Sequence, residues 1–155
     1  QPRGLKTGIS KPEREHYREL LKTLDLGLED RPTSKVGLLS GGQRQALTLL
    51  MATMNNPKLL LLDEHTAALD PKTALKVLTL SAKIVEENNL TTLMITHNMN
   101  DAIKYGNRLI MMSNGRIVFD VSGEEKQKLT KADLLEKFKI SAGEELASDR
   151  VLLSE

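Results

Sequence analysis

Apolar residues recur three or four positions apart in three long segments of the chain, which predicts three amphipathic helices. The first spans about residues 10–27, and the second spans 40–57. The third opens with Asp70 as its N-cap and Pro71 in its first turn. We expect the second helix to bury one stripe of apolar side chains: Ala46, Leu47, Leu50, Met51 and Met54.

Two short apolar runs, Leu59–Leu62 and Thr91–Thr96, have the length and composition of buried strands in a parallel sheet. The same kinds of signal predict four more elements: a helix at 99–105, strands at 108–112 and 116–121 around an Asn-Gly turn, and a helix at 130–139. Strands alternate with helices only after residue 57, so the sequence predicts an α/β fold with a parallel sheet and flanking helices. We therefore expect a helical subdomain over 1–57, a strand-containing core with a C-terminal hairpin over 58–140, and a surface tail over 141–155.

The composition excludes several classes of function. The 155 residues carry a net charge of +1, which gives no case for nucleic-acid binding through bulk charge. Aromatic residues make up only 3% of the chain, so a stacking platform for single strands is not expected. There is no cysteine, which excludes disulfides and thiolate metal sites, and no apolar run long enough to span a bilayer.

Ser40-Gly41-Gly42-Gln43 lies at the start of the second predicted helix. Backbone N–H groups at a helix N-terminus attract anions, and paired glycines let a phosphate approach the backbone closely. The alternative is a simple capping box between Ser40 and Gln43, and from these residues alone the two interpretations are about equally supported. Two glycines in a first turn cost helix stability, on the order of 1 kcal/mol each, and that cost requires a reason.

Asp63 and Glu64 follow the first predicted strand directly. Ligands of open α/β sheets bind at this end of the strands, where one carboxylate can hold hydrated Mg²⁺ and another can activate water. The alternative is a strand that simply ends in a polar loop. His97 follows the second strand, and we expect it at the same sheet edge if the strands are parallel, although a single histidine there is more often an ordinary turn residue.

Taken together, the order of these features resembles the ABC ATPase family over about residues 10–120. Four segments match family motifs: Leu39-Ser40-Gly41-Gly42-Gln43 the signature, Leu59–Glu64 the Walker B strand with its glutamate, Ala68-Leu69-Asp70 the D-loop, and His97 the switch histidine. The resemblance implies part of a P-loop NTPase core, with an N-terminal helical subdomain and a C-terminal hairpin.

The resemblance also implies roles for these residues in an ATP sandwich between two such domains. Asp63 would hold Mg²⁺ through water, Glu64 would polarise the attacking water, and His97 would contact the γ-phosphate. The signature residues would bind the ATP held by the opposing subunit: Ser40, Gly41, Gly42 and Gln43. Asp70 would serve both as a helix N-cap and as a contact across the interface.

A P-loop, G-x-x-x-x-G-K-[ST], does not occur in the 155 residues. The family places its Walker A lysine and its Q-loop before the signature, and the chain begins with Gln1 instead of methionine. We therefore expect this sequence to be a C-terminal fragment that binds ATP very weakly and does not hydrolyse it alone.

The resemblance favours the ATPase subunit of a membrane transporter, an importer of a small solute. Such a subunit would dock on permease subunits at the cytoplasmic face of the membrane and work with a solute-binding protein. The alternative is a non-transport ABC ATPase that acts on ribosomes or DNA, and a third reading is a binding module without ATPase activity. His65 departs from the commoner family pattern, which has proline there, and the segment Asp63–Asp70 is similar to a subgroup associated with amino-acid-like solutes.

Overall fold

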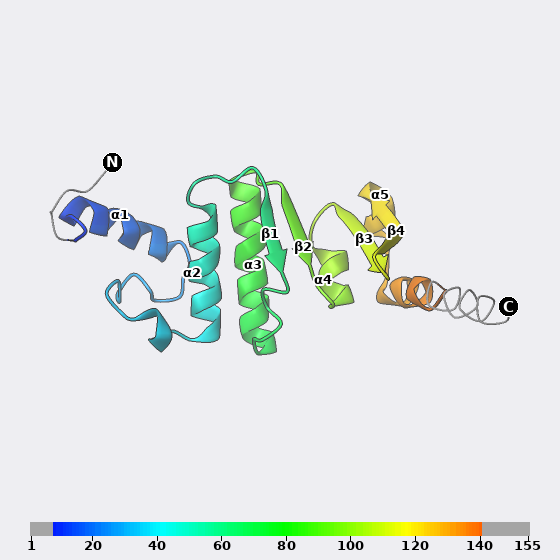
Figure 1. Ribbon diagram of the computed structural model, residues 1–155, viewed down its shortest axis with the longest axis horizontal. Helices are drawn as coiled ribbons and strands as arrows, with labels where there is room; N and C mark the ends of the chain where they lie inside the picture. The colour runs from blue at the N-terminus through cyan, green and yellow to red at the C-terminus, as the bar shows by residue number, and fades with distance from the viewer. Residues whose placement is uncertain (1–7, 141–155) are drawn as a thin grey trace. The chain divides into compact units, whose positions relative to one another are not determined.

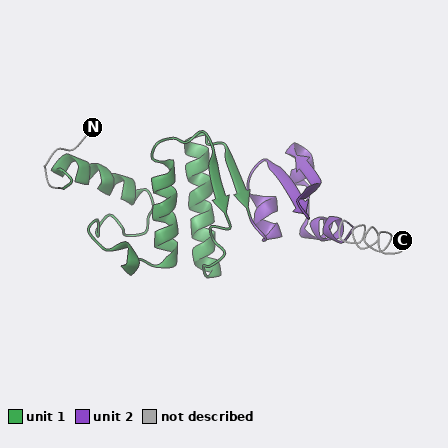
Figure 2. Cartoon of the chain, in the orientation of Figure 1, with its two compact units in different colours: residues 1–95 green, residues 96–155 purple. Residues whose placement is uncertain are grey.

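The computed structural model describes residues 8–140, so the tail predicted at 141–155 lies outside the described residues. The chain forms two compact units, residues 1–95 and residues 96–155, which are shown in different colours in Figure 2. The division into 1–57 and 58–140 expected from the sequence stays a prediction.

Three helices of the first unit begin with side-chain caps, and those at Ser40 and Asp70 are the caps that the sequence predicts. Helix α1 (Lys11–Lys22) starts with a capping box between Ser10 and Glu13. Helix α2 (Gly41–Thr53) starts at Ser40 after a short 3₁₀ turn, η1 (Val36–Leu38). Helix α3 (Pro71–Glu87) starts with Asp70 as N-cap and Pro71 in its first turn.

Strands β1 (Leu60–Asp63) and β2 (Thr92–Ile95) pair in parallel, with Asp63 opposite Ile95 at the end of the ladder. Helices α2 and α3 run side by side next to these strands (Figure 1). Four buried residues join the two helices to the first strand: Leu49, Leu60, Leu62 and Ile84. The parallel pairing predicted from the two apolar runs is confirmed.

Two expectations about burial in the first unit are wrong in part. The run Leu59–Leu62 predicts a strand covered on both faces, but Leu61 keeps 63% of its surface exposed while Leu60 and Leu62 are buried. The buried stripe of α2 is centred on Ala46 and Leu49, whereas Met51 is 64% exposed. Burial therefore alternates along β1, because α2 and α3 of the same unit pack against the face that carries Leu60 and Leu62.

The second unit contains α4 (Met99–Lys104), the antiparallel hairpin β3 (Arg108–Ser113) and β4 (Arg116–Ser122), and α5 (Gly123–Gln127). Residues 131–140 are also helical. The hairpin turn uses positive φ angles at Asn114 and Gly115, as the Asn-Gly signal predicts. The unit's buried core consists of Leu109, Val121 and Leu134. Helix α5 was not predicted. Among residues 8–140, no helix combines the length and apolar character that a membrane span needs.

Candidate functional site

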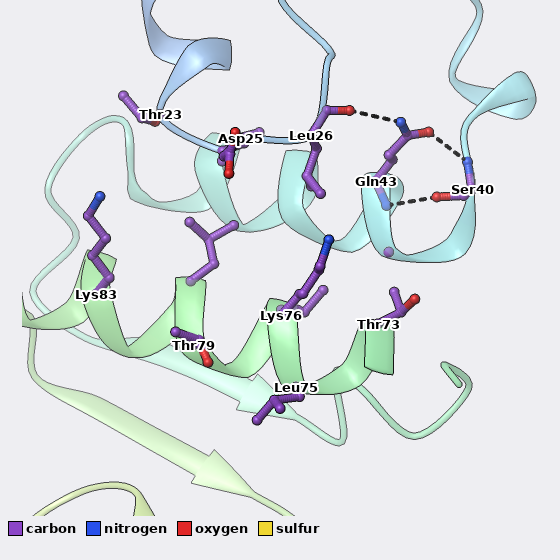
Figure 3. A pocket seen from close by; sticks show the side chains of 14 residues that line it. Thr23, Asp25, Leu26, Ser40, Gln43, Thr73, Leu75, Lys76, Thr79 and Lys83 are labelled. Atoms are coloured by element: carbon purple, nitrogen blue, oxygen red, sulfur yellow. Dashed lines mark hydrogen bonds between the residues drawn. The ribbon is translucent and has the colours of Figure 1, made fainter. Parts of the chain in front are cut away.

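The first turn of α2 is closed by a complete capping box. Ser40 N–H donates to Gln43 Oε1 at 3.1 Å, and Gln43 N–H donates to Ser40 Oγ at 3.3 Å. The Gln43 amide nitrogen also donates to the carbonyl of Leu26 at 3.1 Å (Figure 3). The capping interpretation is therefore confirmed. It is compatible with an anion-binding role, because the backbone N–H groups of the first helical turn lie outside the helix's own ladder.

The paired glycines bring the start of α2 against the first turn of α3 and the residue Leu69 before it. A Cβ on Gly41 would lie 2.9 Å from Leu69 Cδ2, and a Cβ on Gly42 would lie 2.3 Å from Thr73 Cγ2. Leu69 Cδ2 is the tip of a flexible side chain that can move aside, whereas Thr73 Cγ2 belongs to a β-branched side chain in the first turn of α3. Gly42 thus has a packing role that the sequence did not reveal, and it places the signature segment directly beside the start of α3.

A pocket of about 580 Å³ opens between α2 and α3 within the first unit (Figure 3). Ser40, Gly42 and Gln43 line it, together with Lys76 and Lys83 from α3. Asp63 and Glu64 do not line it. This pocket is therefore separate from the acidic strand end, and it is not itself the predicted catalytic centre.

The acidic pair lies at the C-terminal end of β1, as predicted. Asp63 is the last residue of the strand, and Glu64 N–H continues the parallel ladder by donating to the carbonyl of Ile95 at 3.0 Å. Both side chains are exposed. Glu64 has a φ of 41°, in the left-handed region that residues other than glycine rarely adopt. Such strain is typical of functional sites, where the surrounding structure holds it in place.

An exposed carboxylate at Asp63 fits the way proteins bind Mg²⁺. This ion is commonly held by one or two carboxylates together with water and substrate phosphates. Within residues 8–140, no three His, Cys, Asp or Glu side chains gather into a metal site of their own. The donor set therefore suits a metal that arrives with a nucleotide better than a metal enclosed by protein.

The structure gives His65 a specific partner that its position in the sequence did not indicate. Its Nε2 lies 3.0 Å from the hydroxyl oxygen of Ser81 on α3, and burial lowers the pKa of His65 below 6.5. Ser81 is itself buried and donates to the carbonyl of Val77 at 2.8 Å. The sequence offered only a weak signal for this contact, a serine within the apolar face of α3.

Asp70 caps α3, which confirms one of its two predicted roles. Its Oδ1 accepts from Thr73 N–H at 3.1 Å, and hydrogen bonds from Thr73 hold the pKa of the Asp70 carboxyl below 3.8. The carboxyl is exposed, so it is accessible to a partner. Its contact across an interface stays a prediction.

His97 lies in the second unit, between the end of β2 and the start of α4, and its side chain is exposed. The next residue, Asn98, caps α4 by accepting from the N–H groups of Asn100 and Asp101. The backbone of Asn98 in turn donates to Thr96 Oγ1 at 3.0 Å. His97 is thus held between an ordered turn and a capped helix. Its predicted proximity to Glu64 stays a prediction.

Known proteins share both the sequence and the fold. Residues 6–67 match the model of the family described as ABC transporter. The tyrosine transport ATP-binding protein of Clostridioides difficile (strain R20291) is 55% identical over 119 residues, which are 77% of this chain and 47% of that protein. The chain belongs to the ABC ATPase family. The methionine import ATP-binding protein of Bacillus subtilis (strain 168) is 42% identical over 130 residues, covering 80% of this chain and 38% of that protein.

Solved ABC cassettes match the structure as well. One described as the dimeric structure of a bacterial ABC transporter cassette aligns with a TM-score of 0.59 and 35% identity, over 76% of this chain and 50% of that one. A second, an ATP-binding cassette of an ABC transporter, aligns with a TM-score of 0.64 and 31% identity, over 86% and 53%. These matches confirm the predicted P-loop NTPase fold. The matched part of this chain spans about half the length of the two solved cassettes and less than half the length of the two relatives.

Proposed function

We propose that this chain is part of the ATP-hydrolysing subunit of an ABC importer for a small solute of the amino-acid type. One observation supports this most directly: a signature helix N-terminus and an acidic strand end occur in one unit, in the order of the family's motifs. The relatives described above are named for tyrosine transport and methionine import. As in that family, the working form would be a dimer of ATPase domains docked on permease subunits at the cytoplasmic face of the membrane.

In this proposal each residue acts from the position that its element gives it. Glu64, just beyond β1, accepts a proton from the attacking water, and His97 contacts the γ-phosphate. Asp63 holds Mg²⁺ through water, and the ion, when bound, neutralises the charge of the phosphates. Ser40 and the N–H groups of Gly41 and Gly42 face the ATP of the opposing subunit, while Gln43 keeps the helix start closed. Asp70 contacts the opposing subunit from the cap of α3.

The experiment is steady-state ATP hydrolysis by the full-length protein with Glu64→Gln. General-base catalysis is typically worth about 10²–10⁴ in rate, so turnover should fall by that factor while ATP binding is retained. Glu86→Gln is the matched control, because Glu86 is exposed near the end of α3 and has no role in the proposal. Near-normal turnover of Glu64→Gln would refute the assignment of the base.

The 155-residue chain alone should bind ATP weakly and hydrolyse none, since no P-loop occurs in it to cradle the phosphates. Calorimetric titration with MgATP tests this expectation, and micromolar affinity would contradict it. The transport role has a separate test. Purification of the full-length protein from membranes should bring permease subunits with it, and a solute-binding protein should stimulate its ATP hydrolysis in the reconstituted complex.

A further inference from the structure

The side chain of His65 joins the turn that follows β1 to α3. Its Nε2 lies 3.0 Å from Ser81 Oγ, and the Ser81 hydroxyl donates to the carbonyl of Val77 at 2.8 Å. Because serine has a single hydroxyl hydrogen and Val77 receives it, the Ser81 oxygen accepts from the histidine. The proton of His65 therefore resides on Nε2, and this N–H donates a hydrogen bond to Ser81 Oγ.

Glu64, the residue before His65, has a backbone that needs such support. Its φ of 41° is unfavourable for a residue with a side chain, and this conformation persists only where the surroundings hold it. Two backbone hydrogen bonds contribute: Glu64 N–H donates to Ile95 O at 3.0 Å, and Ala67 N–H donates to Glu64 O at 2.9 Å. These bonds hold Glu64 to β2 and to its own turn, but neither ties the turn to α3.

We propose that His65 is a positioning residue for Glu64: its hydrogen bond to Ser81 holds the turn at the angle that aims the Glu64 carboxylate at the attacking water. This inference rests on the proposed function, because it requires Glu64 to be the general base. His65 acts through the backbone and through Ser81, and it does not touch the reacting atoms.

The chain offers matched variants for a test in the full-length protein. His65→Leu fills a similar volume without a donor. His65→Gln places an amide N–H donor at the same number of bonds from Cβ as Nε2, so it can still donate to Ser81. Ser81→Ala keeps the imidazole and removes its acceptor. His16→Leu is the control, because His16 is an exposed histidine on α1.

The measurements are kcat and KM for ATP, with the enzyme concentration normalised by nucleotide-binding stoichiometry. Misplacing a catalytic group by about 1 Å can cost on the order of 10²-fold, so His65→Leu should lower kcat about 10- to 100-fold and leave KM within about twofold. Ser81→Ala should lower kcat in the same way. His65→Gln should recover most of the rate, and His16→Leu should match the wild-type protein.

A second comparison shows whether the effect passes through Glu64. In a Glu64→Gln background, His65→Leu should change the residual turnover by less than about twofold, because residues that act as a unit are not additive. The proposal is overturned if His65→Leu keeps the wild-type kcat, if only the melting temperature falls, or if the loss persists undiminished in the Glu64→Gln background. Equal turnover of the wild-type protein and Glu64→Gln would instead refute the proposed function, and the His65 proposal with it.

Discussion

A Cβ atom placed on Gly42 would lie 2.3 Å from the Cγ2 methyl of Thr73, so these two residues set how closely α2 and α3 approach. Gly42 is buried in the first turn of α2, and Thr73 lies in the first turn of α3. The signature glycine therefore allows a contact between two helix N-termini. This contact also gives a packing reason for a glycine in a helix, where glycine costs stability.

We expect Gly42→Ala to lower the free energy of unfolding by about 1–3 kcal/mol, the usual cost of forcing an extra carbon into a packed contact. Adding Thr73→Ser should reverse the loss. The serine keeps the hydroxyl but lacks the methyl, and the remaining contacts of the new Cβ lie at 3.8 and 3.9 Å. The double variant could then gain up to about 1 kcal/mol, because alanine favours helices over glycine.

Chemical denaturation of the chain measures these changes. Gly37→Ala is the control, since Gly37 has nothing within 4 Å of the added carbon. It should leave stability unchanged or raise it by up to about 1 kcal/mol. If Gly42→Ala were as stable as Gly37→Ala, Thr73 would have to rotate at little cost and the packing role would be refuted.

Local features of this fold could be predicted from the sequence, because each depends on residues only a few positions apart. The caps at Ser40 and Asp70 and the turn at Asn114-Gly115 are of this kind. The parallel pairing of β1 and β2 also followed, since an uninterrupted apolar run is typical of a buried strand.

The contacts that were missed join distant segments. Gly42 meets Thr73 and His65 meets Ser81 between segments far apart in the sequence, and no local pattern encodes either contact. Burial along β1 was wrong in part for another reason. A run of identical leucines contains no alternation from which an exposed face could be read. Helix α5 was missed because its five residues are too few and too polar to show a helical period.

Asp70 should stabilise α3 as a cap independently of any role at an interface. Asp70→Ala removes the acceptor for Thr73 N–H and should lower the melting temperature, whereas Asp70→Asn keeps an acceptor and should lower it less. Circular dichroism melting of the two variants checks the order. If both melted at the same temperature as the wild-type chain, the cap would contribute nothing to the fold.

The cross-strand pair of Arg108 and Asp120 should make the hairpin sensitive to acid. Arg108 Nε donates to Asp120 Oδ1 at 2.8 Å, and this bond holds the pKa of Asp120 below 3.8. The pKa of Asp120 is lower in the folded chain than its ordinary value of 3.8 in the unfolded chain. The ion pair therefore stabilises the fold fully above pH 3.8, and this stabilisation is lost as the pH falls through the folded-state pKa. NMR titration should show the Asp120 pKa rising toward 3.8 in Arg108→Gln. An unchanged pKa in that variant would contradict the assigned cause.

Among the lysines of the second unit, Lys126 should be the one whose replacement lowers the stability of the fold most. Its side chain is buried at 4% exposure, and its Nζ donates to the carbonyl oxygens of Ile103 and Tyr105 at the end of α4. Burial lowers its pKa below 10.5, so the fold retains a charge that is costly to bury. The two carbonyls explain why, since they lie at a helix C-terminus, where a cation is favourable.

We expect Lys126→Met to keep the apolar stem and leave both carbonyls without this donor, at a cost of about 1–3 kcal/mol in the free energy of unfolding. Lys128→Met is the matched control, because Lys128 lies two residues further on and is exposed. Hydrogen exchange of the α4 amides should increase in Lys126→Met and stay unchanged in Lys128→Met, since the lost contacts hold the end of that helix. If the two variants lost equal stability, the apolar surface each change adds would explain the effect, and the Lys126 contacts would not.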